Sequence, residues 1–383
     1  MIILAIETSC DDTCLAIVKV SNKTRPRFKI LSNIISSQVK IHKKWGGIYP
    51  ALAKREHQRN LPLVLKRALK EAKSPKIDLI AVTIGPGLEP CLWVGVNFAK
   101  ALAYFWNLPI VPINHIESHI LANLLPPIRS KLKIENQKSK IQIKNKKIEF
   151  PAICLIVSGG HTQLILMKDF RKYKILGETR DDAAGECFDK VARILGLGYP
   201  GGPIIEALVS MKSKVSRQSR DPDLSGKTQK SKVSLPRPMI HQENYDFSFS
   251  GLKTAVLYNF KTQSPKIRKS KEYIRETAKE VQQAIIEVLI RKTIKAAKEF
   301  KVKSIILGGG VAANDELRKQ FRSNVSLSQI FKENLGRQGF LVPPKIFCTD
   351  NAAMVALAGY YHWLRQKKKN WKDIEAKANL RLE

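Results

Sequence analysis

Long apolar runs and clustered cysteines are both absent from this 383-residue sequence. No stretch approaches the ~20 consecutive apolar residues that span a bilayer, and Met1 leads directly into a strand pattern with no basic leader. We therefore expect a soluble, cytoplasmic protein with no membrane partner. The six cysteines are scattered, with no CxxC pair and no dense spacing, which excludes a disulfide scaffold. We interpret them as reduced thiols, most of them in apolar segments.

Acidic residues are scarce relative to basic ones. The chain has 67 Lys and Arg against 33 Asp and Glu, which gives a formal net charge of +34. Such a charge attracts phosphate polyanions or anionic membrane surfaces, and it does not by itself choose between them. Hydrophobic residues make up 44% of the chain, so it can bury a substantial core, and its length favours two domains over one.

An approximate internal repetition is the most informative pattern. Residues 2–20 form an apolar run, a polar turn and a second apolar run. Residues 152–168 do the same around a turn at 158–161. Alternating apolar runs that flank a short polar turn are typical of β-hairpins, so both segments are predicted to be hairpins.

A second unit also occurs twice. A buried-strand run at 78–84 precedes a glycine turn at 85–87 and a helical pattern. Its counterpart is a strand run at 304–307, a glycine turn at 308–310 and a helical pattern over 314–321. The repetition predicts two similar α/β lobes that face each other across a cleft. Chance similarity of ordinary strands and helices is the alternative.

Three polar segments interrupt this pattern. Residues 129–149 hold eight Lys or Arg against two Glu, and residues 211–237 are also rich in Lys, Arg and Ser. A third polar stretch covers roughly 322–338. We interpret the first two as basic surface insertions. They are explained equally by solvated loops and by direct contact with RNA.

Two histidines four residues apart are candidate metal ligands. On a helix, His115 and His119 share one face and can bind one metal ion, although a third ligand is needed. A metalloprotease would place its glutamate directly after the first histidine. Here Glu117 comes two residues later, about 200° round the helix, which argues against a protease. Taken alone, the pair is also explained as two ordinary hydrogen-bonded histidines.

Asp350 is the candidate third ligand. It lies where an apolar run ends and an Ala-rich helix over 352–361 begins. A carboxylate in this position can cap the helix or bind a metal. Capping is the simpler interpretation when the segment is considered by itself.

Glycine turns after buried strands let a ligand approach the backbone, because no Cβ intervenes and the amide groups can point at phosphate oxygens. Three segments fit this description, at 157–162, 199–203 and 308–314. None of them is a Walker sequence or a GxGxxG fingerprint. Each turn alone is weak evidence for a phosphate site, and their number in one chain strengthens it.

Nine motifs in a fixed order resemble those of one enzyme family, the TsaD type of tRNA N(6)-adenosine threonylcarbamoyltransferase. This family was once labelled a glycoprotein endopeptidase, a label that conflicts with the spacing of Glu117. The motifs lie within residues 2–360, nearly the whole chain. They are IETSCDD, GGIYPALAKREH, GPGLEPCLWVG, NHIESHILAN, VSGGHTQL, DDAAGECFDKVARILGLGYPGGP, FSFSGLKTAV, GGGVAAN and CTDNAAM.

The resemblance implies an actin-like ATPase (ASKHA) fold of two similar lobes with a central cleft. The N-terminal lobe would comprise residues 1–118, joined by a C-terminal helix region at about 350–383, and the C-terminal lobe residues 119–349. The implied reaction transfers a threonylcarbamoyl group from threonylcarbamoyl-AMP to the N6 amine of an adenosine. That adenosine lies 3′ of the anticodon in tRNAs that read codons starting with A.

The resemblance also implies a set of site residues. His115, His119 and Asp350 match the ligands of one divalent metal ion, usually assigned as iron or zinc. Asn314 matches the asparagine of the adenosine turn, and Glu206 falls where some members have a carboxylate that can hold a ribose hydroxyl. The positions expected to contact the substrate are Ile156, Val157, Ser158, Gly159, Gly160, Asp189, Gly202, Glu206 and Asn314.

The implied chemistry is acyl transfer, in which the adenine amine attacks the carbamoyl carbon and AMP leaves. The metal would serve as Lewis acid and template, and positioning would supply much of the acceleration. A strong general base is not required by this scheme, and no catalytic residue is assigned. Asp11 and Asp12 are candidate proton acceptors or supports of the metal ligands. A solvated turn explains these two residues equally well.

Transfer RNA as partner accounts for the net charge of +34 through counterion release. Bacterial relatives also work with a paralogous actin-like protein and a small ATPase, so both are expected partners. Two rival functions stay open from the sequence. One is an actin-like ATPase or kinase, and the other is a non-catalytic tRNA-binding scaffold.

Overall fold

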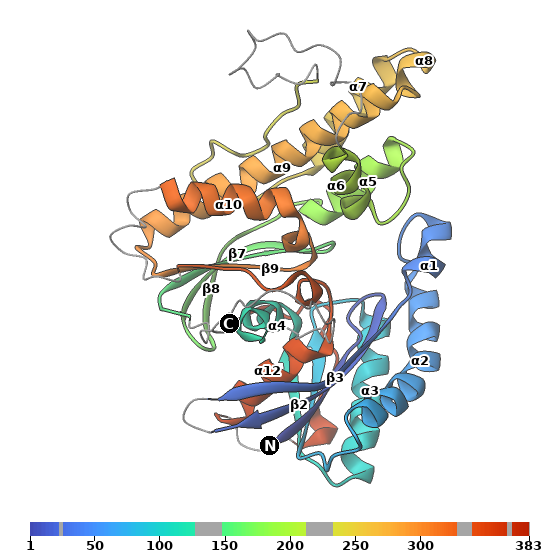
Figure 1. Ribbon diagram of the computed structural model, residues 1–383, viewed down its shortest axis with the longest axis vertical. Helices are drawn as coiled ribbons and strands as arrows, with labels where there is room; N and C mark the ends of the chain where they lie inside the picture. Colours follow the sequence, from blue (N-terminus) through green and yellow to red (C-terminus); the bar gives the residue numbers. More distant parts are fainter. Residues whose placement is uncertain (23–25, 127–147, 212–232, 328–338, 366–369, 383) are drawn as a thin grey trace, which may run out of the picture.

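The computed structural model describes six stretches of the chain, which are residues 1–22, 26–126, 148–211, 233–327, 339–365 and 370–382. Two five-stranded mixed sheets organise them (Figure 1), in the orders β3-β2-β1-β4-β5 and β10-β9-β6-β7-β8. In each sheet three successive strands form an antiparallel meander, and the first of the three also pairs in parallel with a later strand. The sheets share one topology, which confirms the predicted repetition and both hairpins.

The strands of the first sheet are β1 (Ile2–Glu7), β2 (Asp12–Ser21), β3 (Arg27–Ser37), β4 (Leu79–Gly85) and β5 (Ile110–Asn114). Those of the second sheet are β6 (Ala152–Val157), β7 (Thr162–Asp169), β8 (Lys172–Glu178), β9 (Ser304–Gly308) and β10 (Phe340–Leu341). The helices are α1 (Val39–His42), α2 (Pro50–Glu71), α3 (Glu89–Phe105), α4 (His115–Leu121), α5 (Ala184–Ile194), α6 (Gly201–Ser210), α7 (Ser250–Thr262), α8 (Pro265–Arg268), α9 (Lys271–Glu299), α10 (Asp315–Leu327) and α12 (Ala352–Trp363). Short 3₁₀ turns are η1 (Lys43–Trp45), η2 (Ala122–Leu124), η3 (Gly310–Ala313), η4 (Lys345–Phe347) and η5 (Trp371–Asp373).

Alternation along β1 explains how the layers are stacked. Successive side chains of a strand point to opposite faces of the sheet, and here both sets are apolar. Ile3 and Ala5 belong to a buried cluster shared with α4, α12 and the second sheet. Leu4 and Ile6 belong to a different cluster, formed with α2 and α3. The first sheet is therefore covered on both faces, and α4 and α12 lie between the two sheets.

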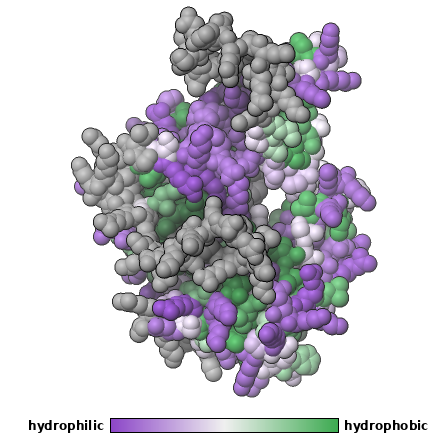
Figure 2. Space-filling model, in the orientation of Figure 1, coloured by the Kyte–Doolittle hydropathy of each residue, from purple (hydrophilic) through white to green (hydrophobic). Residues whose placement is uncertain are grey.

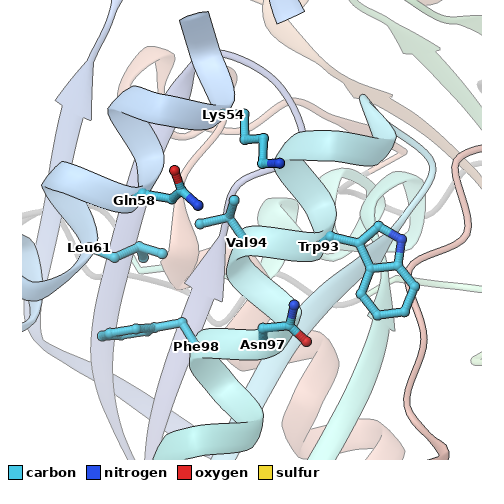
Figure 3. Close-up of a pocket in the computed structure, with 7 residues that line it drawn as sticks. All are labelled: Lys54, Gln58, Leu61, Trp93, Val94, Asn97 and Phe98. Carbon is cyan, nitrogen blue, oxygen red and sulfur yellow. The ribbon is translucent and has the colours of Figure 1, made fainter. Parts of the chain in front are cut away.

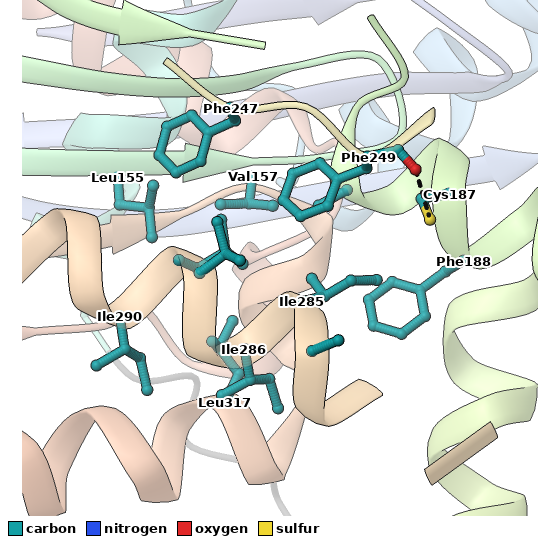
Figure 4. Packing of buried hydrophobic residues seen from close by; sticks show 14 of the residues in the cluster. Leu155, Val157, Cys187, Phe188, Phe247, Phe249, Ile285, Ile286, Ile290 and Leu317 are labelled. Atoms are coloured by element: carbon teal, nitrogen blue, oxygen red, sulfur yellow. Dashed lines mark hydrogen bonds between the residues drawn. The ribbon is translucent and has the colours of Figure 1, made fainter. Parts of the chain in front are cut away.

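The outer face of the second sheet has its own core (Figure 4). Leu155 and Val157 of β6 pack with Phe247 and Phe249, and Ile285 brings α9 onto the same cluster. The solvent side of these helices is different in character, since hydrophilic residues cover α9 and α10 on the face shown in Figure 2. Aromatic and aliphatic side chains therefore fill the space between the second sheet and α9.

The predicted insertions are corrected in part. Residues 129–147, 212–232 and 328–338 lie outside the described residues. Residues 233–237 do not behave as a surface loop, because Val233 and Leu235 are buried in the core of the second sheet and Arg237 pairs with glutamates of α9. Residues 322–327 belong to helix α10, and the assignment of this polar stretch as an insertion stays a prediction.

Other expectations can be compared with the described part of the chain. All six cysteines are free thiols there, as predicted. No described helix is both long and apolar enough to cross a membrane. The expected boundary between the lobes, after residue 118, falls inside α4, which packs against both sheets. That boundary stays a prediction.

Gly309 offers a test of how tightly the ends of β6 and β9 are packed. Its φ of +87° and ψ of 165° suit glycine almost exclusively, and an added Cβ would lie 2.3 Å from the Val157 carbonyl oxygen. We expect Gly309→Ala to lower the free energy of unfolding by about 3 kcal/mol, measured by urea denaturation. Gly310→Ala is the matched control, since no atom lies within 4 Å of its added Cβ. Equal stability of the two variants would contradict this packing.

Candidate metal centre

The histidine-bearing helix begins where a strand of the first sheet ends. Strand β5 finishes at Asn114, whose side chain accepts hydrogen bonds from the backbone N–H groups of Ile116 and Glu117. This cap starts α4 at His115 without an intervening loop. His115 and His119 are therefore placed by the buried strand itself, on one face of a buried helix.

Three ligand atoms converge at this helix. The Nε2 atoms of His115 and His119 are 3.2 Å apart. The Asp350 Oδ1 atom lies 3.2 Å from the His119 Nε2 atom and 3.6 Å from the His115 Nε2 atom. The lone pairs of two imidazole nitrogens and one carboxylate oxygen repel one another at such short distances. A proton or a metal ion among them is therefore needed to supply positive charge. Among the described residues, His115, His119 and Asp350 are the one group of side chains placed to bind a metal ion together.

Asp350 reaches the histidines because a neighbour takes over the capping of α12. The Asn351 side chain accepts a hydrogen bond from the Met354 backbone N–H and is the N-cap of the helix. The simpler interpretation from sequence, that Asp350 itself is the cap, is therefore wrong. Its carboxylate is left to face His115 and His119.

A group of polar side chains orients His115 from behind. The Glu7 Oε2 atom lies 2.9 Å from the His115 Nδ1 atom and accepts a hydrogen bond from the Thr83 hydroxyl. The Ser9 hydroxyl lies 3.2 Å from the same Nδ1 atom. With Nδ1–H directed at the carboxylate, Nε2 is the ring nitrogen that faces His119 and Asp350, and its lone pair is free for a metal once its proton is lost. Sequence reasoning missed Glu7, whose signal was a lone carboxylate at the end of an apolar strand.

The charges of these groups depend on one another. Burial disfavours a charge on His115, but the carboxylates of Glu7 and Asp350 outweigh it and raise the pKa of His115 to about 9. Burial also favours neutral Asp350, yet the charge of His115 and the hydrogen bond from His119 lower the pKa of Asp350 to about 2. Burial lowers the pKa of His119. Without metal, one proton on His115 supplies the positive charge at the centre.

Glu117 faces away from this centre, as its spacing predicted. The Tyr173 hydroxyl donates to one oxygen of the Glu117 carboxylate at 2.9 Å. The His362 Nε2 atom lies 2.6 Å from the other oxygen. These contacts tie α4 to β8 and to the end of α12. Glu117 is thus a structural carboxylate and not a base positioned at the candidate metal site.

Other titratable groups surround the centre. His161, in the turn after β6, has a pKa lowered to about 4 by burial, reinforced by the nearby His115 and His119. Burial, reinforced by the charge of Asp350, raises the pKa of Asp11 to about 6. Burial also raises the pKa of Asp12 to about 7. All three side chains are therefore near enough to Asp350 to feel its charge. His161 was not predicted as a site residue.

The glycines of this region fall into two groups. An added Cβ on Gly185 would collide with the Ser158 carbonyl, and one on Gly309 with the Val157 carbonyl, so these two glycines allow close packing. Gly159, Gly160 and Gly202 have no atom within 4 Å of an added Cβ. Among the described hydrogen bonds, none engages the backbone N–H of Gly159 or Gly160. The turn at 158–161 thus presents free amide donors.

The predicted substrate residues outside β6 and its turn fall into two groups. Asp189 accepts a hydrogen bond from the Gly201 backbone N–H at 2.6 Å, which brings it next to Gly202. Glu206 accepts from the backbone N–H of Asp315 at 2.7 Å, which brings it beside Asn314. Asn314 already donates to Gln282 and caps α10.

The remaining predicted contacts belong to β6 and its turn. The side chains of Ile156 and Val157 are fully buried, so they position the turn, and only their backbone is left to touch a ligand. Ser158 is partly exposed, and its hydroxyl accepts from the His161 backbone N–H at 3.1 Å. Contact of any of these residues with substrate stays a prediction.

A separate groove lies on the far side of the first sheet, between α2 and α3 (Figure 3). It has a volume of about 380 Å³ and includes none of the predicted site residues. The residues that line it are Lys54, Gln58, Leu61, Trp93, Val94, Asn97 and Phe98.

Comparison with known proteins supports one family. The family model described as TsaD, tRNA N6-adenosine threonylcarbamoyltransferase, matches residues 29–357. The chain is similar to the enzyme of that name from Thermosipho africanus, with 44% identity over 384 residues and 100% of each chain covered. It is 42% identical over 388 residues to that of Persephonella marina, covering 100% of this chain and 96% of the other.

A solved structure supports the fold. Full-length HypF in its phosphate- and nucleotide-bound form matches with a TM-score of 0.53 and 12% identity, covering 96% of this chain and 47% of its own. At this identity the likeness concerns the fold alone. It confirms the actin-like α/β fold that the sequence predicted.

Proton competition gives a testable signature of the centre. Because His115 holds a proton below its pKa of about 9, a metal ion must displace that proton, and the proton is lost as pH rises. We expect the affinity for Zn²⁺ to increase about tenfold per pH unit between pH 6 and 8.5, measured by competition with a chelator. Glu7→Gln removes a carboxylate that raises the pKa of His115, so its affinity should depend less on pH. Affinity independent of pH in the wild type would contradict the assignment.

Proposed function

The chain belongs to the family of tRNA N6-adenosine threonylcarbamoyltransferases, and on that premise we propose the details of its reaction. It is a tRNA-modifying transferase. The donor we propose is threonylcarbamoyl-AMP, and the acceptor is the N6 amine of the adenosine 3′ of the anticodon in tRNAs that read codons starting with A. The convergence of His115, His119 and Asp350 is the observation that supports a metal-dependent transfer.

We propose that the three residues hold one divalent ion, iron or zinc. Imidazole nitrogen and carboxylate oxygen suit both metals, and Glu7 fixes the ring of His115 as is usual behind a metal-ligating histidine. Three protein ligands leave at least one coordination position for a substrate. When bound, the ion supplies a Lewis acid that orients the donor and neutralises charge near its phosphate.

The glycine turns provide the rest of the donor site in this proposal. The free amides of Gly159 and Gly160 would receive the phosphate and the developing negative charge. Asp189 and Gly202 lie together at the start of α6. Glu206 and Asn314 lie together at the start of α10, which suits the ribose and the adenine. Together they would fix the donor relative to the metal ligands.

The atoms and electrons of the transfer balance without any cofactor other than the metal ion. The adenine N6 atom forms a bond to the carbamoyl carbon, the bond from that carbon to the phosphate oxygen breaks, and AMP leaves with the electron pair. One N6 proton must be accepted. Asp11 and Asp12 are the candidates, because their pKa values of about 6 and about 7 are closer to neutrality than those of ordinary carboxylates.

The proposed partners follow from the substrate and the family. Transfer RNA accounts for the net charge of +34 and for the expectation that binding weakens steeply with salt. We also propose a paralogous actin-like protein and a small ATPase, as in bacterial relatives, and a cytoplasmic location, where tRNA is found. The rival functions are not favoured. A kinase or ATPase would not need His115 and His119, and a decayed scaffold would not keep the converging ligands.

A reconstituted transfer assay tests the proposed function. Purified protein, tRNA transcript, threonylcarbamoyl-AMP and the partner proteins are combined, and modified adenosine is measured by mass spectrometry. Wild type should give product. His115→Ala should lose roughly 100-fold or more of the rate, because a metal contributes several kcal/mol to stabilising the transition state.

His241→Ala is the matched control, since this histidine is exposed and lies outside the centre. It should retain the wild-type rate. Full activity of His115→Ala would reject the metal-dependent reaction, and inactivity of the folded wild type with its partners would reject the transferase.

A further inference from the structure

An exposed pair of aromatic rings lies on the segment that joins β3 to α2. Trp45 is 67% exposed and Tyr49 is 55% exposed. Their rings are stacked, with centroids 5.9 Å apart and an interplanar angle of 28°. Burying two such large aromatic side chains would be favourable, so a pair left at the surface is available to a partner. We call Trp45 and Tyr49 the aromatic platform.

The aromatic platform is held in place by its own segment. The backbone N–H of Tyr49 donates to the Nδ1 atom of buried His42 at 3.3 Å. The His42 Nε2 atom lies 3.1 Å from the Gln38 side-chain oxygen. Gly46 takes the left-handed conformation, with φ of +65°, and its N–H bonds to the Lys43 carbonyl. The rings are thus presented by a fixed turn, which lowers the entropy cost of binding.

The segment bridges the two lobes beside the metal centre. At its start, the Gln38 backbone N–H donates to the Asp11 carbonyl at 3.0 Å, and Asp11 senses the charge of Asp350. At the platform, the Arg193 guanidinium of α5 donates to the Gly46 carbonyl. Helix α5 also carries Asp189, a predicted substrate contact. Figure 1 shows α1 reaching from the first lobe toward α5 and α6.

Basic residues predominate in the segment that carries the aromatic platform, and Glu56 follows it on α2. Residues 38–55 contain five Lys or Arg and no Asp or Glu. All five cations are exposed, and they are Lys40, Lys43, Lys44, Lys54 and Arg55. An apolar protein partner would need no such set of cations, whereas a polyanion with accessible ring faces would use both features.

Unpaired nucleotides of RNA combine these two properties. Their bases stack on aromatic side chains, whereas the bases of a duplex are already stacked inside it. A nucleotide that enters the site for modification leaves its neighbours outside. We propose that the aromatic platform stacks on an unpaired base of the tRNA anticodon loop, while Lys43 and Lys44 bind the flanking phosphates. This inference rests on the proposed function, because it takes tRNA as the acceptor.

Binding and kinetics of a double variant test the proposal. Trp45→Ala with Tyr49→Ala should weaken binding of tRNA, and of an isolated anticodon stem-loop, by about 5- to 100-fold, as expected for the loss of stacking on one base. The KM for tRNA should rise to a similar extent, and the KM for threonylcarbamoyl-AMP should stay unchanged. The single variant Trp45→Phe keeps a ring face at this position, so it should retain most of the wild-type affinity for tRNA.

Phe105→Ala is the matched control. Phe105 is 79% exposed and also contacts a neighbouring aromatic ring. It lies at the end of α3 that precedes β5, whereas His115 follows the other end of that strand. Its loss should leave tRNA binding unchanged. Unfolding temperatures of all variants should match the wild type, since the substituted side chains are exposed.

Salt dependence separates the two halves of the proposal. Lys43→Gln with Lys44→Gln should reduce the slope of log affinity against log salt concentration by about 0.7 for each lysine. The aromatic variants should lower the affinity without changing this slope. If the aromatic double variant unfolds, Trp45→Ala alone and the lysine variant decide the question by the same measurements.

The outcomes distinguish this inference from the proposed function. Wild-type affinity for tRNA in the aromatic variant would overturn the platform while leaving the transferase intact. Unchanged tRNA binding together with a lost response to the partner proteins would also overturn it, in favour of a protein-docking surface. Failure of wild type to modify tRNA would reject the proposed function, and the binding comparison would still decide whether the platform contacts RNA.

Discussion

The placement of three ligand atoms around one position is the constraint on which the rest of the structure depends. Two imidazole nitrogens and a carboxylate oxygen lie 3.2 to 3.6 Å apart, and a positive charge must hold them together. Strand β5 leads directly into the helix with the histidines, and Asp350 immediately precedes the cap of α12. Glu7 ends β1, which is two strands from β5 in the same sheet. Sheet topology therefore brings together residues that are far apart in sequence.

The second of the two similar sheets forms the side of the site opposite the three candidate metal ligands. Helices α4 and α12 lie between two sheets of one topology, so the ligands face the ends of β6 and β9. Gly308 there allows the chain to approach the His119 backbone. Gly159 and Gly160 instead leave open space and free amides. One repeat thus contributes the candidate metal ligands and the other contributes turns with free amides, an arrangement suited to the phosphorylated donor that we propose.

Sequence reasoning reached the repetition, both hairpins and the two histidines, because each depends on local periodicity. It offered Asp350 but ranked capping first, since spacing cannot show that Asn351 takes the cap. Glu7 was missed because its role depends on how β1 lies beside β4 and Thr83. The prediction of a surface loop at residues 233–237 was wrong. It rested on the Lys-rich composition of the preceding residues, whereas Val233 and Leu235 pack in the core with α9. Long-range packing decides the cases of Glu7 and residues 233–237, and a local pattern does not encode it.

The central claim is that His115, His119 and Asp350 together bind one metal ion with a position left for the donor. The most direct measurement is a crystal structure of the protein with its donor, with anomalous scattering recorded at the absorption edges of iron and zinc. The account predicts one anomalous peak at about 2.0–2.2 Å from both Nε2 atoms and the Asp350 carboxylate, with a non-protein ligand completing its coordination. No peak there, or a metal bound elsewhere, would contradict it.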